Sequence, residues 1–366
     1  MWVLGALLVC AIGGRAWAQA TLPPGIQEAP TLSSQQQADL EAFIQAQVET
    51  MRTGSTLRAR SQARDQLLAM FDRPSVSTAF RFATGSALSD PIAQLIESEE
   101  GFLRYAGYRL AARTATEASA RVFERGVATS NKSDQFIALG QVRVLFLEAD
   151  RGGLAMQSST LERLAGTIGR LLAEETDPHV ALYQVRALRA LSAIRRAELS
   201  PAARRGLMEL SRGVSERLQS IPARSFGQSD EDLTHLLVFM ESMDAVRSSL
   251  ATLAGPLNGD LAAEMAHLAG QNLALVTRVY GRVPPTAENA RRHLERLVER
   301  SMESTKQIFA AMQVPNPPPL PDPATLVRSL SGGNMNNFRI EVIKLIGENG
   351  LLYRQFNFKP DTFQLD

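Results

Sequence analysis

Two stretches of the chain decide the fold: residues 134–145 read DQFIALGQVRVL, and residues 177–188 read DPHVALYQVRAL. Seven of the twelve aligned positions are identical, at an offset of 43 residues. A further amphipathic segment lies between them at residues 161–172, so one unit holds two helices and two turns. A period of about forty residues built from helix pairs is typical of a solenoid, in which each pair buries its apolar face against its neighbours.

Helical periodicity extends outward from this repeat over most of the region from residue 32 to residue 312. A weaker copy of the unit begins at residue 100, and no long stretch alternates as a strand does. Ser34 and Gln37 have the spacing of a capping box at the start of the first helix, and Gly54 ends it. The spacing of that helix predicts one buried face, formed by Leu40, Phe43, Ile44, Val48 and Met51.

We therefore predict an all-α protein, an α-solenoid of helix pairs with a C-terminal helical segment and a small hairpin-like tail. Prolines and glycines separate its parts, because these residues interrupt helices. The predicted parts are a signal peptide (1–18), a flexible spacer (19–31), helical repeats (32–225), a helical cap or small bundle (229–312), a Pro/Gly-rich linker (313–336) and the tail (337–366).

The first eighteen residues are typical of a secretory signal peptide. An apolar run at residues 2–14 is too short to span a membrane comfortably, and small residues follow at Ala16 and Ala18. Cleavage after Ala18 or after Ala20 fits the pattern, and an uncleaved N-terminal anchor is the alternative. We expect a periplasmic or secreted bacterial protein without a membrane span once the signal is cleaved. The only cysteine, Cys10, lies within this segment, so the mature chain would form no disulfide.

The repeated unit resembles HEAT repeats. The resemblance rests on Asp177-Pro178-x-Val180 followed by Val185-Arg186-Ala187-Leu188, and it covers roughly residues 75–215. It implies that a turn aspartate and a helix arginine pair between neighbouring repeats inside the stack. A basic stripe that holds an anionic ligand is the alternative role for the arginines. The residues concerned are Asp134, Asp177, Arg143 and Arg186, with Glu100 and Arg109 in the weaker copy.

The tail differs in pattern from the rest of the chain. Residues 338–347 read FRIEVIKLIG, and Asn349-Gly350 then precedes LLYRQFNF. Alternating apolar residues around an Asn-Gly turn favour a β-hairpin, although the first arm also fits a helix. A lone hairpin is marginally stable in water, so the tail either folds back on its own solenoid or docks on a partner. Its aromatic residues include Phe338, Tyr353, Phe356 and Phe358.

Common catalytic signatures are absent from the sequence: it has no Gly-x-Ser-x-Gly elbow, no His-Glu-x-x-His helix and no phosphate loop. Asp232 with His235, and Glu264 with His267, have the spacing of paired metal-binding helices. However, Glu264 and His267 fall opposite the apolar side of their helix, which predicts that they face solvent. We therefore expect neither a metal site nor a cofactor.

Lysine and arginine total 39 and aspartate and glutamate total 38, which argues against a nucleic-acid binder that relies on strong net positive charge. The leading hypothesis is an exported, non-catalytic scaffold or adaptor that binds a protein partner in the bacterial envelope. The alternative is an envelope enzyme or small-ligand binder with a cleft between the solenoid and the helices of residues 229–312.

Overall fold

The computed structural model describes residues 22–72, 76–152, 156–221, 229–252, 257–314, 319–359 and 361–365. The predicted signal peptide lies outside these residues, as does part of the proline-rich linker. The chain divides into two units, residues 1–87 and residues 88–366, and the boundary falls within helix α3 (Thr78–Ile96).

The first unit contains α1 (Ser34–Thr53), α2 (Leu57–Ala69) and the first half of α3. A short 3₁₀ helix (Ile26–Glu28) precedes them. The predicted capping box is wrong by one residue, because Ser33 caps α1 and Gln36 completes the box. The predicted buried face of α1 is confirmed: Leu40, Phe43, Ile44, Val48 and Met51 are all buried.

The second unit is also helical, and none of the described residues of the chain forms a strand. The prediction of an all-α protein is therefore confirmed. Among the described residues, no helix is both long and apolar enough to span a membrane. After the second half of α3, the helices of the second unit are α4 (Gly101–Thr114), α5 (Glu117–Val127), α6 (Lys132–Asp150), α7 (Ser158–Glu174), α8 (Pro178–Ser192), α9 (Ser200–Ser220), α10 (Asp230–Thr252), α11 (Gly259–Val279), α12 (Glu288–Ala311), α13 (Pro323–Ser331), α14 (Met335–Ile346) and α15 (Leu351–Phe356).

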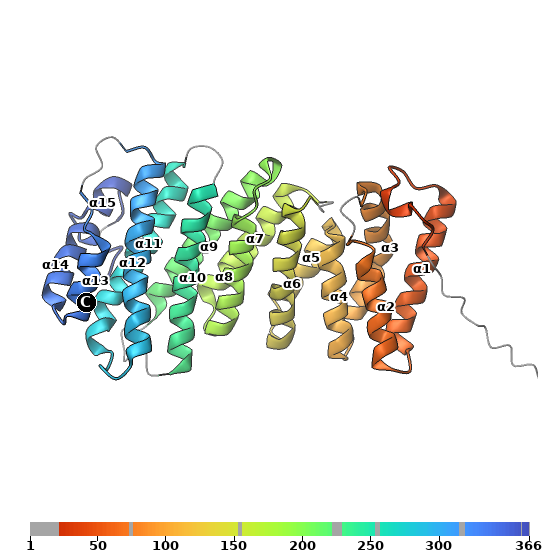
Figure 1. Cartoon of the computed structure of the whole chain (residues 1–366), viewed down its shortest axis with the longest axis horizontal. Coiled ribbons are helices and arrows are strands. Elements are labelled where there is room, and N and C mark those ends of the chain that lie inside the picture. The colour runs from red at the N-terminus through yellow and green to blue at the C-terminus, as the bar shows by residue number, and fades with distance from the viewer. Residues whose placement is uncertain are drawn as a thin grey trace, which may run out of the picture. The chain divides into compact units, whose positions relative to one another are not determined.

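These helices alternate between two layers, as in a solenoid. In the first layer, α4, α6, α8, α10 and α12 each pack against the next, and Figure 1 shows them following one another in that order. In the second layer, α5, α7, α9 and α11 do the same. The helices of residues 229–312 continue this alternation, because α10 packs on α8 and α11 packs on α9. The described structure is thus compatible with a helical repeat fold.

Close packing of α7 against α9 in the second layer depends on glycine. A Cβ atom on Gly169 would lie 2.7 Å from Cβ of Glu209, and one on Gly213 would lie 2.7 Å from the carbonyl oxygen of Gly169. Real Cβ atoms do not approach other atoms so closely, so larger residues at these positions would force the two helices apart.

The predicted hairpin in the tail is wrong: this segment forms α14 and α15. Phe338, Val342 and Ile346 are buried at a spacing of four residues, whereas Ile340 and Ile343 are 54% and 42% exposed. The burial therefore follows a helical period, which confirms the helical alternative for the first arm. The Asn334 side chain caps α14 by accepting a hydrogen bond from the backbone N–H of Asn337. Within the predicted Pro/Gly-rich linker, residues Pro323–Ser331 form helix α13.

The end of the chain packs on α11. Nε2 of Gln271 donates a 2.6 Å hydrogen bond to the carbonyl oxygen of Thr362, and the Phe363 ring lies against Gly270. The rings of Phe358 and Phe363 lie 5.6 Å and 5.7 Å from the imidazole of His267, measured between centroids. The prediction that His267 faces solvent is wrong, because the tail covers it. This segment folds back on its own solenoid.

Candidate protein-docking face

The structure separates the repeat residues that were expected to pair with one another. Asp134 accepts a 2.7 Å charge-assisted hydrogen bond from Nε of Arg104, so it joins α6 to α4. Asp177 instead caps its own helix by accepting from the backbone N–H of His179 at 2.8 Å. Neither aspartate pairs with Arg143 within the described residues. The resemblance implied that each aspartate pairs with a repeat arginine. Instead, Asp134 pairs with Arg104 of the preceding helix pair, and Asp177 serves as a helix cap.

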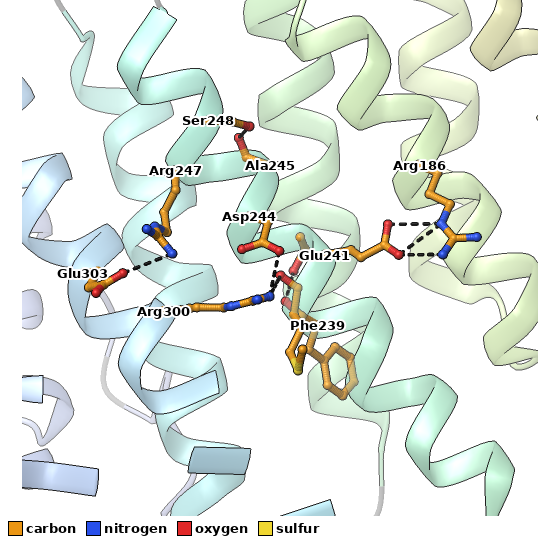
Figure 2. Close-up of polar contacts among 11 residues, drawn as sticks. Arg186, Phe239, Glu241, Asp244, Ala245, Arg247, Ser248, Arg300 and Glu303 are labelled. Atoms are coloured by element: carbon orange, nitrogen blue, oxygen red, sulfur yellow. Dashed lines mark hydrogen bonds and ion pairs between the residues drawn. The ribbon is translucent and has the colours of Figure 1, made fainter. Parts of the chain in front are cut away.

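Ion pairs link most neighbouring helices of the first layer. Arg104–Asp134 and Arg113–Glu148 join α4 to α6, the latter at 2.6 Å. Figure 2 shows the next ionic link of the layer, in which Arg186 of α8 donates hydrogen bonds to the carboxylate of Glu241 of α10. It also shows the two pairs that join α10 to α12, Arg300–Asp244 at 2.7 Å and Arg247–Glu303 at 3.1 Å. Arg104–Asp134, Arg186–Glu241, Arg300–Asp244 and Arg247–Glu303 are partly exposed, so each of these pairs contributes only about 0–1 kcal/mol to stability.

The contact between α6 and α8 is different, because no ion pair joins these two helices within the described part of the chain. Instead the rings of Phe136 and Tyr183 meet edge to face, with centroids 5.2 Å apart. The guanidinium of Arg186 lies 5.9 Å from the centre of the Tyr183 ring. Aromatic packing thus replaces the ionic link at this step of the layer.

Large apolar side chains reach solvent on the helices α4, α6 and α8. Tyr183 is 38% exposed, Leu147 on α6 is 43% exposed, and Tyr105 on the neighbouring helix α4 is 36% exposed. On α6, Phe136, Gly140, Arg143 and Leu147 follow one another at spacings of three or four residues, which places them on one side of the helix. We call the following set the docking face: Tyr105, Arg109, Phe136, Gly140, Arg143, Leu147, Tyr183 and Arg186.

The arginines of the docking face occupy equivalent places on three neighbouring helices. The repeat alignment matches Arg109, Arg143 and Arg186 on α4, α6 and α8. Helices α4 and α8 contain arginines and no acidic residue at all. Arg109 and Arg143 form no hydrogen bond or ion pair with any described residue. The docking face therefore combines exposed rings with positive charge that the described chain leaves unneutralised.

Gly140 lies in the interior of α6, where glycine costs about 1 kcal/mol relative to alanine. A Cβ atom built on Gly140 would meet no atom nearer than Cε1 of Tyr183, at 4.0 Å. That separation is an ordinary van der Waals contact. Packing among the described residues therefore does not require glycine here, in contrast to Gly169 and Gly213.

The sequence indicated the arginines of this face but not its rings or its glycine. The same repeat alignment that matches Arg143 with Arg186 also matches Gly140 with Tyr183. Combining it with helical spacing would have placed all four residues on one face. The exposure of Leu147 and Tyr105 has no such signal, because apolar residues at these spacings are equally typical of a buried face.

The aromatic residues predicted as a docking tail are used within the chain. Phe338 is fully buried and Tyr353 is 7% exposed. The Phe356 ring meets Phe309 of α12 edge to face at 6.0 Å. Phe358 lies between the rings of Tyr353 and Phe363 and close to His267. These contacts leave the tail little free aromatic surface for a partner.

The two Asp/Glu–His pairs lie in separate surroundings. Nδ1 of His235 lies 3.3 Å from Nη2 of Arg217. Burial, followed by the nearby Arg217 charge, lowers the pKa of His235 from 6.5 to about 4. Burial also lowers the pKa of His267 below its usual range. Within the described residues, no three His, Cys, Asp or Glu side chains are placed together to hold a metal ion.

Two open cavities are lined by residues that do not belong to the docking face. One of about 700 Å³ lies where Leu233 of α10 meets the start of α12, with Glu288 and Arg292 among its polar lining residues. Another of about 390 Å³ lies within the first unit beside Phe82, which is 69% exposed. Neither is lined by histidine or cysteine.

No known protein-family profile matches this chain, and no curated protein sequence matches it either.

Proposed function

We propose that this chain is an exported, non-catalytic scaffold that binds a protein partner through the docking face of its first helical layer. The observation that carries the proposal is the combination of exposed rings on α4 and α8 with unneutralised arginines on α4 and α6. Aromatic residues and arginine are enriched where proteins bind one another, because they bury large areas and form directional polar contacts. Helical repeats present such side chains on a surface that spans several units.

The finer assignment to a HEAT-like repeat rests on the two aligned units and on the alternating helix layers. Export rests on the apolar segment at residues 2–14 and on the small residues at Ala16 and Ala18. The bacterial envelope is the compartment that this segment favours. Cell fractionation with N-terminal sequencing tests this part: we expect an envelope or secreted protein that begins at Gln19 or Thr21. Recovery from the cytoplasm with an intact N-terminus would reject export.

The docking face itself is tested by capture from an envelope extract with two double variants. The docking variant, Tyr105→Ser with Leu147→Ser, removes two exposed apolar side chains from the face. The matched control, Ile340→Ser with Ile343→Ser, removes two exposed apolar side chains from α14. We expect the unchanged chain and the control to retain one partner in equal molar amount, and the docking variant to lose it.

Two outcomes would contradict the proposal. If the unchanged chain retained no partner, the scaffold function would be rejected. If the control lost the partner and the docking variant kept it, binding would belong to the tail and not to the docking face. Circular dichroism and thermal melting of both variants check that each remains folded, so that loss of the partner reports on the surface.

A further inference from the structure

We propose that the docking face recognises an extended acidic segment of its partner, with a carboxylate at about every third residue. This inference rests on the proposed function and deepens it by naming the chemistry of the partner. It is carried by the charge of the face, the spacing of its arginines and the free space over Gly140.

The positive charge of the docking face is complementary to carboxylates supplied by a partner. Other arginines of the first layer are already neutralised: Arg104 by Asp134, Arg113 by Glu148 and Arg300 by Asp244. Arg109 and Arg143 have no such partner among the described residues. At the position on α8 that aligns with Arg143, the chain presents another arginine, Arg186. Like charges therefore recur from helix to helix, and an anionic ligand would reduce their mutual repulsion.

The chain itself shows how this row of arginines can hold a carboxylate. Arg186 donates from Nη2 to Oε1 of Glu241 at 2.7 Å and from Nε to Oε2 at 3.1 Å. This forked geometry is the strong form of arginine–carboxylate recognition. Helix α10 supplies Glu241 and is rich in acidic residues, so the positive row ends there. An incoming segment would therefore bind across α4 and α6 and end at Arg186.

The spacing of the helices sets the spacing of the carboxylates. Packed helices lie about 8–10 Å apart, and a peptide in the polyproline II conformation advances about 3.1 Å per residue with three residues per turn, so every third side chain points to the same side. A peptide that crosses the layer therefore places every third side chain over the next helix. The residues between the carboxylates would contact Tyr105 and Tyr183, which are sequence-tolerant apolar surfaces. The absence of a side chain at Gly140 leaves room for the peptide backbone to approach α6.

A single-stranded nucleic acid is the competing ligand, since it also binds arginines and stacks on aromatic rings. The balance of 39 basic against 38 acidic residues favours the acidic peptide, because nucleic-acid binders rely on a larger basic excess. The Tyr183 ring already meets Phe136 and Arg186, which leaves less of its surface free for base stacking.

Fluorescence anisotropy of the purified chain tests this inference with labelled peptides. The probe is a twelve-residue peptide of four Glu-Thr-Val repeats, and its control replaces every glutamate with glutamine. We expect the glutamate peptide to bind at least about tenfold more tightly than the glutamine peptide. A peptide of the same composition with its four glutamates adjacent should bind more weakly than the evenly spaced one.

Paired charge variants locate the binding. The double variant Arg109→Gln with Arg143→Gln should weaken binding of the glutamate peptide about tenfold. The matched control, Arg121→Gln with Arg170→Gln, removes two exposed arginines from α5 and α7 of the second layer and should change binding less than about twofold. Equal losses in the two double variants would show a general charge effect and overturn the inference.

Two further results would overturn the inference. One is equal binding of the glutamate and glutamine peptides. The other is a twelve-residue oligothymidylate that binds more tightly than the glutamate peptide and loses its binding in the Arg109/Arg143 variant. Failure of the peptide would leave the proposed function separately testable, because partner capture that depends on Tyr105 and Leu147 does not require an acidic segment.

Discussion

The tail and the docking face both concentrate aromatic residues, yet the molecule uses them in opposite ways. In the tail, Tyr353 and Phe363 meet edge to face at 5.5 Å, and both rings are buried. On the docking face, Tyr183 meets Phe136 at a similar separation of 5.2 Å but remains 38% exposed. Ring content alone therefore does not identify a docking surface. What distinguishes the two regions is whether another part of the chain covers the rings.

The two regions also differ in what their glycines do. In α11, Gly270 makes room for the Phe363 ring, so the absence of a side chain serves packing within the chain. In α6, a Cβ atom on Gly140 would lie 4.0 Å from Cε1 of Tyr183, so an added methyl group fits without a collision. Packing within the chain therefore requires glycine at position 270 but not at position 140. Comparing substitutions in the tail with substitutions on the docking face tests this distinction.

The largest expected difference is between Phe338→Ala and Tyr183→Ala. Phe338 is fully buried, so its truncation should lower the free energy of unfolding by about 3–5 kcal/mol. Tyr183 is partly exposed, and its truncation should lower that free energy by about 1 kcal/mol. Chemical denaturation followed by circular dichroism measures both values. Equal losses would mean that the docking face is as firmly packed as the tail.

Alanine substitutions at Gly270 and Gly140 should change the free energy of unfolding in opposite directions, and the change at Gly270 should be the larger. In Gly270→Ala, the new methyl group would collide with the Phe363 ring and lower the free energy of unfolding by about 1–3 kcal/mol. Limited proteolysis should then cut the chain near its C-terminus more rapidly than in the unchanged protein. If stability and the rate of proteolysis did not change, the packing of the Phe363 ring against Gly270 would be contradicted.

Acid should loosen the tail before it affects the docking face. Burial under Phe358 and Phe363 lowers the pKa of His267 below 6.5, the ordinary value, and the Glu264 carboxylate opposes this shift. Because the folded pKa lies below the unfolded one, the contribution to stability is complete above pH 6.5 and is lost as the pH falls through the folded value. Hydrogen exchange should increase first in residues 351–359 and 361–365. His267→Gln should remove this dependence.

Gly140→Ala should produce the smallest effect, and its sign is the informative part. The nearest atom to the added methyl group would be 4.0 Å away, so alanine fits and raises the free energy of unfolding by about 0.5–1 kcal/mol. Thermal melting measures this gain. A loss of stability would show that packing requires this glycine after all, and the argument for free space above α6 would fail.

Much of the helical core could be predicted from the sequence, because apolar residues recur with the helical period. The buried face of α1 follows directly from that period. The tail was misread because Phe338, Ile340 and Val342 alternate locally as a strand does. Contacts of α14 with α11 and α13 favour the helix, and local sequence does not contain that information.

The candidate site was only partly accessible from the sequence. Repetition indicated Arg143 and Arg186 as equivalent residues. The partners of Asp134 and Arg186 could not be predicted, because Arg104 and Glu241 meet these residues only after the helices stack. Solvent exposure of Tyr183 is likewise set by its neighbours in the layer, and no local pattern specifies it.

Site-specific photocross-linking in living cells tests the central claim most directly. A photoreactive phenylalanine derivative would replace Tyr183 on the docking face, and in a control chain it would replace Arg170 on α7. We predict one discrete adduct of higher mass from position 183 and none from position 170. The absence of an adduct at position 183, or equal adducts at the two positions, would contradict the account that this face binds a protein partner.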